Sequence, residues 1–279
     1  MSKCFHHGDF DGCLSAHIVG LYENDDVKFF SMNYNTPIPF NKIEKDERVY
    51  IVDFSFKQQE FEKLLNITKN VIWIDHHQTA IEKSKGMPWE NVVGIRQVGK
   101  AGCELTWECL FPKKQMPTIV KMIGRYDVWD FSTYGDVLHA ITCGLKLYDT
   151  TPESSIWDIL INNEYCIDEL IKTGEVAKSF RDNLFAGYLK KCGFVCEFEG
   201  YKTICCNMGT GGSMLFDSIN KNNYDLMSSF CYNGDVWFVS LYTTKDNINC
   251  GEICKKYGGG GHQQAAGFFT KELPFKKSK

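Results

Sequence analysis

Carboxylates and imidazoles gather at three points of the sequence, each directly after a short apolar run. The three groups are His7-Gly8-Asp9-Phe10-Asp11, Asp53, and Asp75-His76-His77. Acids that converge in space raise one another's pKa values unless a cation neutralises them. Carboxylate and imidazole ligands without a thiolate suit Mn²⁺ and, less well, Mg²⁺. Two such ions that share a carboxylate would activate water for attack on a phosphorus atom.

The apolar runs that precede these groups are predicted to be strands. Extended segments are expected at Lys3–His6, Val27–Met32, Val49–Val52 and Val71–Ile74, with a further one at Val92–Gln97. Helical periodicity between them, at Gly12–Tyr22 and Gln58–Leu65, indicates βαβ units and a parallel sheet. Ligands bind outside the carboxyl ends of such strands, so the acids are expected to meet at one edge.

Within the first group, we also expect a common direction for the side chains. If the backbone stays extended, alternation with a period of two points His7, Asp9 and Asp11 the same way.

The predicted secondary structure changes twice along the rest of the chain. Helical patterns dominate after residue 101, and the segments expected are Cys103–Phe111, Pro117–Tyr126, Val137–Leu147 and Ser155–Leu189. Strand patterns return after Gly193, at Phe194–Glu199, Lys202–Cys206, Leu226–Tyr232 and Val236–Tyr242, and Asn233-Gly234 predicts a hairpin between the last two. We therefore expect an α/β fold: a metal-binding domain over 1–150, a helical connector over 151–192, and a smaller α+β domain over 193–279.

Length and composition exclude several classes of protein. The chain has 279 residues, of which 43% are hydrophobic, so it is long enough to bury a sizeable core. No apolar run approaches the roughly 18–20 residues of a membrane span, and a cytoplasmic protein is expected. A net charge of −4 argues against the nonspecific holding of long duplexes. The 13 cysteines are scattered and are expected to be reduced thiols.

A run of glycines near the end of the chain is the second candidate site. Gly258-Gly259-Gly260-Gly261-His262 follows a helical pattern at Gly251–Tyr257. One interpretation is the end of a helix followed by a flexible turn. The other is a cradle in which the amides of Gly259, Gly260 and Gly261, with the His262 side chain, hold a phosphate.

Taken together, these motifs resemble the DHH phosphoesterase family, in its DHH-plus-DHHA1 branch of oligoribonucleases and dinucleotide phosphodiesterases. Asp75-His76-His77 is similar to the motif that names the family. His7-x-Asp9-x-Asp11-Gly12, Val52-Asp53 and Tyr126-Asp127-Val128-Trp129 resemble its other metal-binding motifs, and Gly258–Phe268 resembles the DHHA1 signature. The resemblance extends over nearly the whole chain.

The resemblance implies a metal site with two Mn²⁺ ions, or Mg²⁺ or another divalent ion in their place. One ion would take His7, Asp9 and Asp53. The other would take Asp11, Asp53, His76 and Asp127, with Asp53 bridging the two. His6 and Asp130 are the alternatives to His7 and Asp127 as ligands.

It also implies roles in catalysis. Asp75 would orient its neighbours, and His77 would contact the scissile phosphate or protonate the leaving oxygen. Gly259, Gly260, Gly261 and His262 would hold the nucleotide or its terminal phosphate. The expected activity is hydrolysis of short oligoribonucleotides or linear dinucleotides to mononucleotides.

The sequence leaves other functions open. Cyclic dinucleotides, cyclic mononucleotides and nucleoside bisphosphates such as phosphoadenosine phosphate are alternative substrates. A nucleotide-binding module without catalysis is the alternative from another class. The oligomeric state is open.

Overall fold

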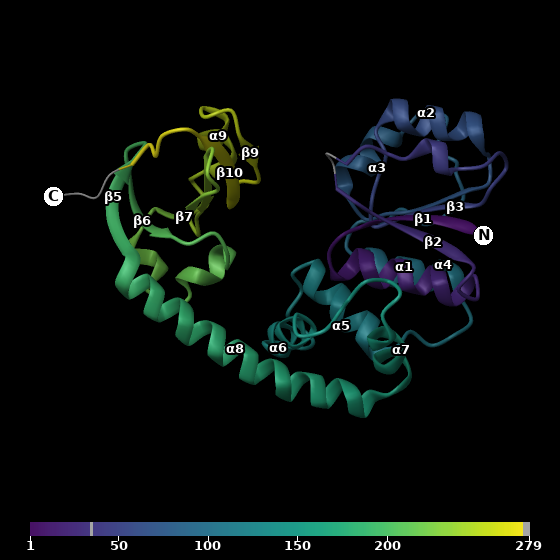
Figure 1. Ribbon diagram of the computed structural model, residues 1–279, viewed down its shortest axis with the longest axis horizontal. Helices are drawn as coiled ribbons and strands as arrows, with labels where there is room; N and C mark the ends of the chain where they lie inside the picture. Colours follow the sequence, from purple (N-terminus) through teal and green to yellow (C-terminus); the bar gives the residue numbers. More distant parts are fainter. Residues whose placement is uncertain (34–35, 276–279) are drawn as a thin grey trace. The chain divides into compact units, whose positions relative to one another are not determined.

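A computed structural model describes residues 1–33 and 36–275 and divides the chain into two compact units. The first unit spans Met1–Lys178 and the second spans Ser179–Lys279. The division falls within α8 (Glu164–Cys192), a single helix of 29 residues (Figure 1). It therefore lies inside the 151–192 stretch that the sequence predicts as a helical connector.

The first unit contains the predicted parallel sheet. Its strands are β1 (Ser2–His7), β2 (Val27–Met32), β3 (Val49–Val52) and β4 (Val71–Ile74), in the order β2-β1-β3-β4. All three pairings are parallel, and Phe5 lies opposite both Phe30 and Ile51. The central strand β3 is buried on both faces, and its sequence is accordingly apolar throughout. All four strands end at the same edge.

Helices cover both faces of this sheet (Figure 1). On one face lie α1 (Phe10–Tyr22) and α4 (Gly102–Leu110), which pack against Tyr50 and Val52. On the other lies α2 (Gln58–Ile67), whose Phe61 and Leu64 are fully buried. Each of these buried side chains contributes about 1.5–3 kcal/mol of hydrophobic stabilisation. The short helix α3 (Gln78–Ser84) follows β4.

The extended segment predicted at Val92–Gln97 forms only a partial fifth strand. It makes two isolated parallel bridges, Ile72 with Val93 and Asp75 with Arg96. Between them Gly94 has a φ of +129°, and a Cβ there would lie 2.0 Å from the Trp73 carbonyl oxygen. The left-handed backbone at Gly94 interrupts the regular ladder.

Three further helices complete the first unit: α5 (Thr118–Asp127), α6 (Val137–Leu145) and α7 (Ser155–Asn162). The sequence predicts one helix over Ser155–Leu189, but the structure has two, α7 and α8. Asn163 adopts an extended conformation and its side chain accepts a hydrogen bond from the Tyr165 N–H, which interrupts the helix. Trp157 and Leu160 of α7 are buried in the core of the first unit.

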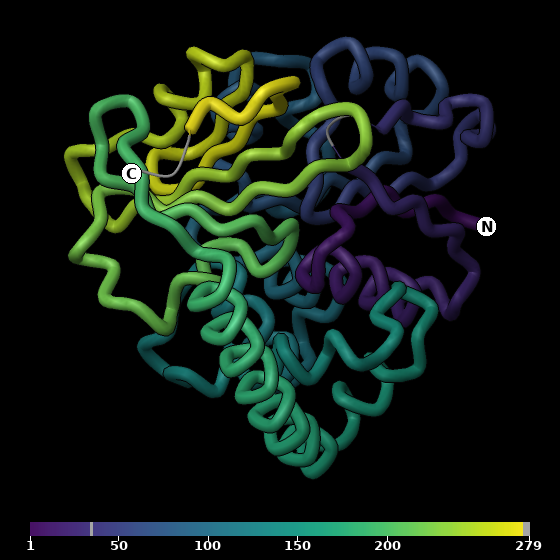
Figure 2. Tube along the Cα trace, turned by 60° about the vertical axis from the view of Figure 1, so that its left-hand side comes forward, coloured from purple at the N-terminus to yellow at the C-terminus, as the bar shows by residue number. Residues whose placement is uncertain are grey.

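The second unit is built on a mixed sheet of six strands. They are β5 (Gly193–Phe198), β6 (Tyr201–Asn207), β7 (Leu226–Tyr232), β8 (Trp237–Tyr242), β9 (Gly260–Gly261) and β10 (Ala265–Thr270), in the order β5-β6-β7-β8-β10-β9. Only β6 and β7 pair in parallel among these described strands. Figure 2 shows the end of α8 leading directly into β5.

The local features of this sheet follow from the sequence. Asn233-Gly234 forms the predicted hairpin turn, with Gly234 at a φ of +107° and the Asn233 side chain accepting from two N–H groups. The helix α9 (Cys250–Lys255) packs Ile253 and Cys254 against one face of the sheet. The mixed α/β fold is confirmed. Within residues 1–33 and 36–275, no helix is long and apolar enough to cross a bilayer.

Candidate metal centre

The first group of acids lies where β1 ends and α1 begins. Asp9 caps α1, because its Oδ1 accepts the Gly12 N–H at 2.9 Å, and its Oδ2 lies 2.6 Å from His7 Nδ1. Asp11 lies in the first turn of the helix and is 2% exposed. The extended alternation predicted for His7, Asp9 and Asp11 is wrong, because the chain turns into the helix after Asp9. A Cβ on Gly12 would lie 2.3 Å from the His7 carbonyl oxygen, so this turn requires glycine.

The start of α4 holds the carboxylate of Asp11. The backbone N–H of Gly102 donates to Asp11 Oδ2 at 2.7 Å, and that of Cys103 donates to Oδ1 at 2.8 Å. A helix N-terminus stabilises a negative charge placed in this way. A Cβ on Gly102 would lie 2.6 Å from the Asp53 Cβ, so only glycine lets α4 approach. The sequence alone did not indicate a role for Gly102. The signal that could have done so is a glycine directly before the predicted helix Cys103–Phe111.

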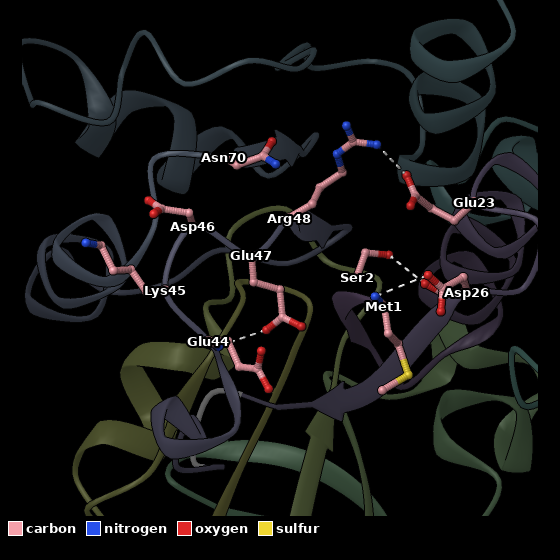
Figure 3. A pocket seen from close by; sticks show the side chains of 10 residues that line it. All are labelled: Met1, Ser2, Glu23, Asp26, Glu44, Lys45, Asp46, Glu47, Arg48 and Asn70. Atoms are coloured by element: carbon pink, nitrogen blue, oxygen red, sulfur yellow. Dashed lines mark hydrogen bonds and ion pairs between the residues drawn. The ribbon is translucent and has the colours of Figure 1, made fainter.

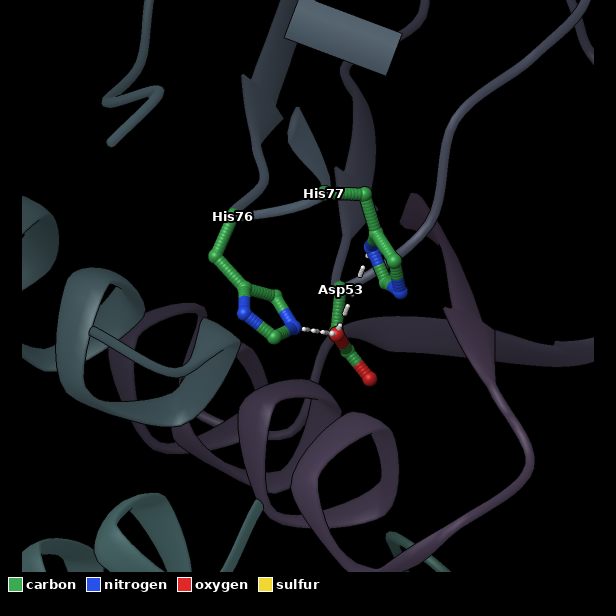
Figure 4. Close-up of side chains that lie close together, drawn as sticks. All are labelled: Asp53, His76 and His77. Carbon is green, nitrogen blue, oxygen red and sulfur yellow. Dashed lines mark hydrogen bonds and ion pairs between the residues drawn. The ribbon is translucent and has the colours of Figure 1, made fainter. Parts of the chain in front are cut away.

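Asp53 lies beside His76 and His77 (Figure 4). It is 1% exposed and has a φ of +49°, a conformation unusual for a residue with a side chain. Its Oδ1 lies 3.0 Å from His76 Nε2, and its Oδ2 lies 3.9 Å from His7 Nδ1 and has no hydrogen-bond partner in the described part of the chain. Burial, and then the charge of Asp11, raise the pKa of Asp53 well above its ordinary value.

His76 faces three carboxylates. Its Nε2 lies 3.0 Å from Asp53 Oδ1, 3.4 Å from Asp127 Oδ2 and 3.8 Å from Asp11 Oδ2. Asp127 comes from the last position of α5, so this group joins three distant parts of the first unit. Burial, and then Asp11, raise the pKa of Asp127 from its ordinary 3.8 to about 7. Burial lowers the pKa of His76.

These side chains form overlapping groups whose ligand atoms lie within 4.8 Å of one another. The groups are His7, Asp9 and Asp53; Asp11, His76 and Asp127; and Asp53, His76 and His77. The unpartnered oxygen of Asp53 and the raised pKa values of Asp53 and Asp127 indicate an excess of negative charge that the protein itself does not balance. A divalent cation would balance it, and the oxygen and imidazole donors suit Mn²⁺ or Mg²⁺.

The two alternative ligands have other partners. His6 Nδ1 lies 2.7 Å from the His7 carbonyl oxygen, and its ring contacts that of Phe29. The Asp130 carboxylate accepts hydrogen bonds from Ser132 and from Arg125. Neither residue belongs to the three groups.

Asp75 holds the segment that carries both histidines. It is fully buried, and its Oδ1 accepts from the backbone N–H groups of His76 and His77, at 2.8 Å and 3.1 Å. The same oxygen lies 2.7 Å from His77 Nδ1. This hydrogen bond raises the pKa of His77 above its ordinary 6.5. Asp75 therefore orients the His77 ring and favours its protonated form.

The glycine run lies in the second unit, between α9 and β10. Gly258 has a φ of +78°, and a Cβ on Gly259 would lie 2.2 Å from the Gly267 carbonyl oxygen. Gly261 is equally confined by Ala266, whereas a Cβ on Gly260 would meet nothing within 4 Å. The fold thus accounts for three of the four glycines. His262 is exposed in the turn that joins β9 to β10.

Two arginines of the first unit have structural partners. Arg96 donates to the carbonyl oxygens of Trp73, Val92 and Glu90. Arg125 pairs with the carboxylates of Glu104 and Asp130. These contacts give both guanidinium groups a role in the fold.

A hollow of about 330 Å³ lies at the opposite edge of the sheet, where the strands begin (Figure 3). It is lined by charged groups that pair with one another, among them the Met1 amino group with Asp26 and Arg48 with Glu23. The acidic groups described above lie at the other ends of these strands. The hollow is therefore separate from the candidate metal centre.

No family model matches the chain. Among curated proteins, it is 26% identical over 271 residues to the uncharacterized protein R106 of Acanthamoeba polyphaga mimivirus, which covers 93% of this chain and 61% of the relative. It is 22% identical over 307 residues to the oligoribonuclease NrnB of Bacillus subtilis, which covers 96% of this chain and 72% of the relative. The chain thus spans about three fifths of the length of the mimivirus protein.

Solved structures share the fold at low sequence identity. The pGpG-specific phosphodiesterase PggH of Vibrio cholerae superposes with a TM-score of 0.59 and 16% identity, over 97% of this chain and 94% of that one. The Mn²⁺ complex of RecJ from Thermus thermophilus gives a TM-score of 0.51 and 15% identity, over 96% of this chain and 49% of that one. The DHH domain of a member of a ribosomal protein family gives a TM-score of 0.50 and 12% identity, over 96% of this chain and 82% of that one.

Proposed function

We propose that this chain, which shares its fold and its motifs with DHH/DHHA1 phosphoesterases, is a member of that family and a two-metal phosphodiesterase. Its proposed substrates are short oligoribonucleotides or linear dinucleotides, and its products are mononucleotides. The similarity to an oligoribonuclease of Bacillus subtilis and to a pGpG-specific phosphodiesterase of Vibrio cholerae supports this choice. The net charge of −4 disfavours nonspecific binding of long polyanions, which agrees with a short substrate.

One observation carries the proposal: the two oxygens of Asp53 face different groups of ligands. Oδ1 faces His76, which lies near Asp11 and Asp127, and Oδ2 faces His7. A carboxylate placed in this way can serve two cations at once. Two Mn²⁺ or Mg²⁺ ions, when bound, would polarise the phosphate and lower the pKa of an attacking water.

In this proposal, side chains of the protein supply the proton that the leaving oxygen needs. His77 Nδ1 is engaged by Asp75, which leaves Nε2 as the nitrogen that can exchange a proton with the substrate. Because the Asp75 carboxylate raises the pKa of His77, the imidazolium is available near neutral pH. His77 would then donate its Nε2 proton to the oxygen that leaves phosphorus, as a general acid. Asp75 acts through His77 by fixing its ring and its charge.

Binding of the nucleotide is assigned to the second unit. We propose that the exposed His262 side chain and the open space beside Gly260, where a Cβ would meet nothing within 4 Å, receive a phosphate of the substrate. Backbone amides and an imidazole are suitable donors for a phosphate.

The proposal is tested by incubating the full chain with Mn²⁺ and a panel of substrates. The panel comprises pApA, pGpG, RNAs of two to seven nucleotides, cyclic dinucleotides, a cyclic mononucleotide and phosphoadenosine phosphate, ranked by kcat/KM. We expect the linear dinucleotides and short RNAs to rank highest. Asp53→Asn should abolish Mn²⁺-dependent turnover, and Asp168→Asn, which alters an exposed acid on α8, should not. No turnover of any substrate, together with measurable nucleotide binding, would indicate a binding module instead.

A further inference from the structure

Trp129 is an exposed aromatic residue beside the candidate metal centre. Its side chain is 65% exposed, whereas the tryptophans at 73, 89, 107 and 157 in the same unit are at most 6% exposed. It follows Asp127 by two residues, and Asp127 Oδ2 lies 3.4 Å from His76 Nε2. A large aromatic side chain is therefore presented to solvent two residues along the chain from one of the acidic groups.

The backbone of Trp129 is held in an unfavourable conformation. Its φ is +60°, which a bulky residue rarely adopts unless the surroundings impose it. The Trp129 N–H donates to the Tyr126 carbonyl oxygen at 3.1 Å, and the Asp130 N–H donates to that of Arg125 at 2.8 Å. The Arg125 guanidinium also pairs with the Asp130 carboxylate at 3.3 Å. The turn that projects Trp129 is thus fixed from both sides.

Neighbouring rings orient the indole without covering it. Phe131 and His139 lie with ring centroids 5.1 Å and 6.0 Å from Trp129, at interplanar angles of 86° and 80°. Such nearly perpendicular contacts fix the plane of a ring and do not cover it as flat stacking would. Apart from Phe131, the residues that follow in the chain, Asp130, Ser132 and Thr133, are polar. Trp129 is the exposed ring of this aromatic cluster, since Tyr126, Phe131 and His139 are partly buried, and one exposed, oriented ring fits a small flat ligand better than it fits a protein surface, which needs a contiguous apolar patch.

We propose that Trp129 is a stacking platform for a nucleobase of the substrate. Aromatic side chains stack on any base, because every base presents a π face. A base on Trp129 would place the phosphate attached to it near Asp127 and His76. This inference rests on the proposed function, since it assigns one base-binding position of the same site.

The activity test compares substrates with and without bases. Wild type, Trp129→Phe and Trp129→Ala are assayed with Mn²⁺ on pApA and on two analogues that carry an abasic residue at the 5′ or the 3′ position. We expect Trp129→Ala to raise the KM for pApA about tenfold or more, and Trp129→Phe to retain most of the affinity. One of the two abasic analogues should be hydrolysed equally well by wild type and Trp129→Ala. Equal losses on pApA and both analogues, or no loss on pApA, would overturn the proposal.

The control is Tyr165→Ala. Tyr165 is 67% exposed, and it lies near the start of α5, since its neighbour Glu164 accepts a hydrogen bond from Thr118. This variant removes an equally exposed ring at the other end of α5 and should leave the KM for pApA unchanged. A similar rise in KM would show that the effect does not belong to Trp129.

Fluorescence separates this inference from the proposed activity. Addition of AMP with Mg²⁺ should quench part of the emission from the 6 tryptophans of wild type, and that part should be absent in Trp129→Phe. If no phosphodiester is hydrolysed but the quenching depends on Trp129, the platform is supported and the activity is wrong. If pApA is hydrolysed and neither quenching nor KM depends on Trp129, the activity is supported and the platform is wrong.

Discussion

The backbone N–H of Gly102 donates a hydrogen bond to Asp11 Oδ2 at 2.7 Å and so ties the start of α4 to the first turn of α1. The two residues are 91 positions apart in sequence. The contact depends on the missing side chain, because a Cβ on Gly102 would lie 2.9 Å from that oxygen and 2.6 Å from the Asp53 Cβ. Two proposed metal ligands therefore depend on one glycine for their positions.

Gly102→Ala is expected to damage the metal centre more than the fold. The added methyl group must displace Asp53 or α4, and overpacking of this kind costs about 1–3 kcal/mol. We expect at least a hundredfold loss of kcat/KM on pApA and a weaker affinity for Mn²⁺, measured by kinetics and by calorimetric titration. Gly187→Ala on α8 is the control, since a Cβ there meets nothing within 4 Å and should stabilise the helix slightly. Normal Mn²⁺ affinity in Gly102→Ala would contradict the assignment.

The stability of the metal-free protein should fall as the pH rises toward 8. The folded state holds a proton on Asp127 up to a pKa of about 7, whereas the unfolded chain loses it near the ordinary 3.8. The folded state thus binds more protons between these two values, and stability declines with rising pH over that window. Thermal unfolding in EDTA at pH 5, 6, 7 and 8 measures this slope.

Two further unfolding experiments test whether Asp127 causes the decline of stability with pH. Mg²⁺ should raise the Tm most at pH 8, where the carboxylates are charged and repel one another. Asp127→Asn in EDTA should flatten the decline of Tm with pH. An unchanged slope in this variant would assign the effect to other groups.

The role of His77 is tested by changing the leaving group. His77→Ala should lower kcat on pApA by roughly 10²–10⁴, because the departing ribose oxygen then lacks a proton donor. A p-nitrophenyl ester of a nucleoside 5′-monophosphate has a leaving group that departs as an anion, so its hydrolysis should be far less affected. Asp75→Asn should show the same selectivity with a smaller loss. Equal losses on both substrates would indicate that His77 binds the phosphate and does not protonate it.

The glycine run offers a comparison between neighbouring positions. Gly260→Ala should leave the Tm unchanged, since a Cβ there meets nothing, whereas Gly259→Ala should lower it because of the Gly267 carbonyl oxygen 2.2 Å away. If the run holds a phosphate, Gly260→Ala should raise the KM for pApA several-fold with little change in kcat, and His262→Ala should do likewise. An unchanged KM in both variants would leave the run with a purely structural role.

The strands that carry the acids could be predicted from sequence because they are buried on both faces. Val49–Val52 and Val71–Ile74 agree with the structure in both bounds. The convergence of Asp53, His76 and Asp127 was also predicted, although Asp127 followed from motif resemblance and not from the helical pattern around it.

Three features could not be predicted from the sequence. They depend on contacts between residues far apart in the chain, or on a side chain that competes with the backbone for a hydrogen bond. The contact between Asp11 and the start of α4 requires glycine at position 102, because a Cβ there would collide with Asp53. Only the folded structure brings Asp53 to that position. The break at Asn163 reflects a side chain that bonds the backbone in place of the helix. The composition of the glycine run fits a phosphate-binding loop. In the structure, however, Gly258 is required by its positive φ, and Gly259 and Gly261 are required by close packing against their neighbours.

The strand order β2-β1-β3-β4 has a consequence for where any ligand would bind. From β1 the chain crosses over α1 to β2 on one side, and from β3 it crosses over α2 to β4 on the other. Connections that depart in opposite directions leave a crevice between the carboxyl ends of β1 and β3, known as a topological switch point. His7 and Asp53 sit at these two strand ends. The connectivity of the strands therefore predicts where a ligand binds, and the acids and imidazoles at that place determine which ligand it is.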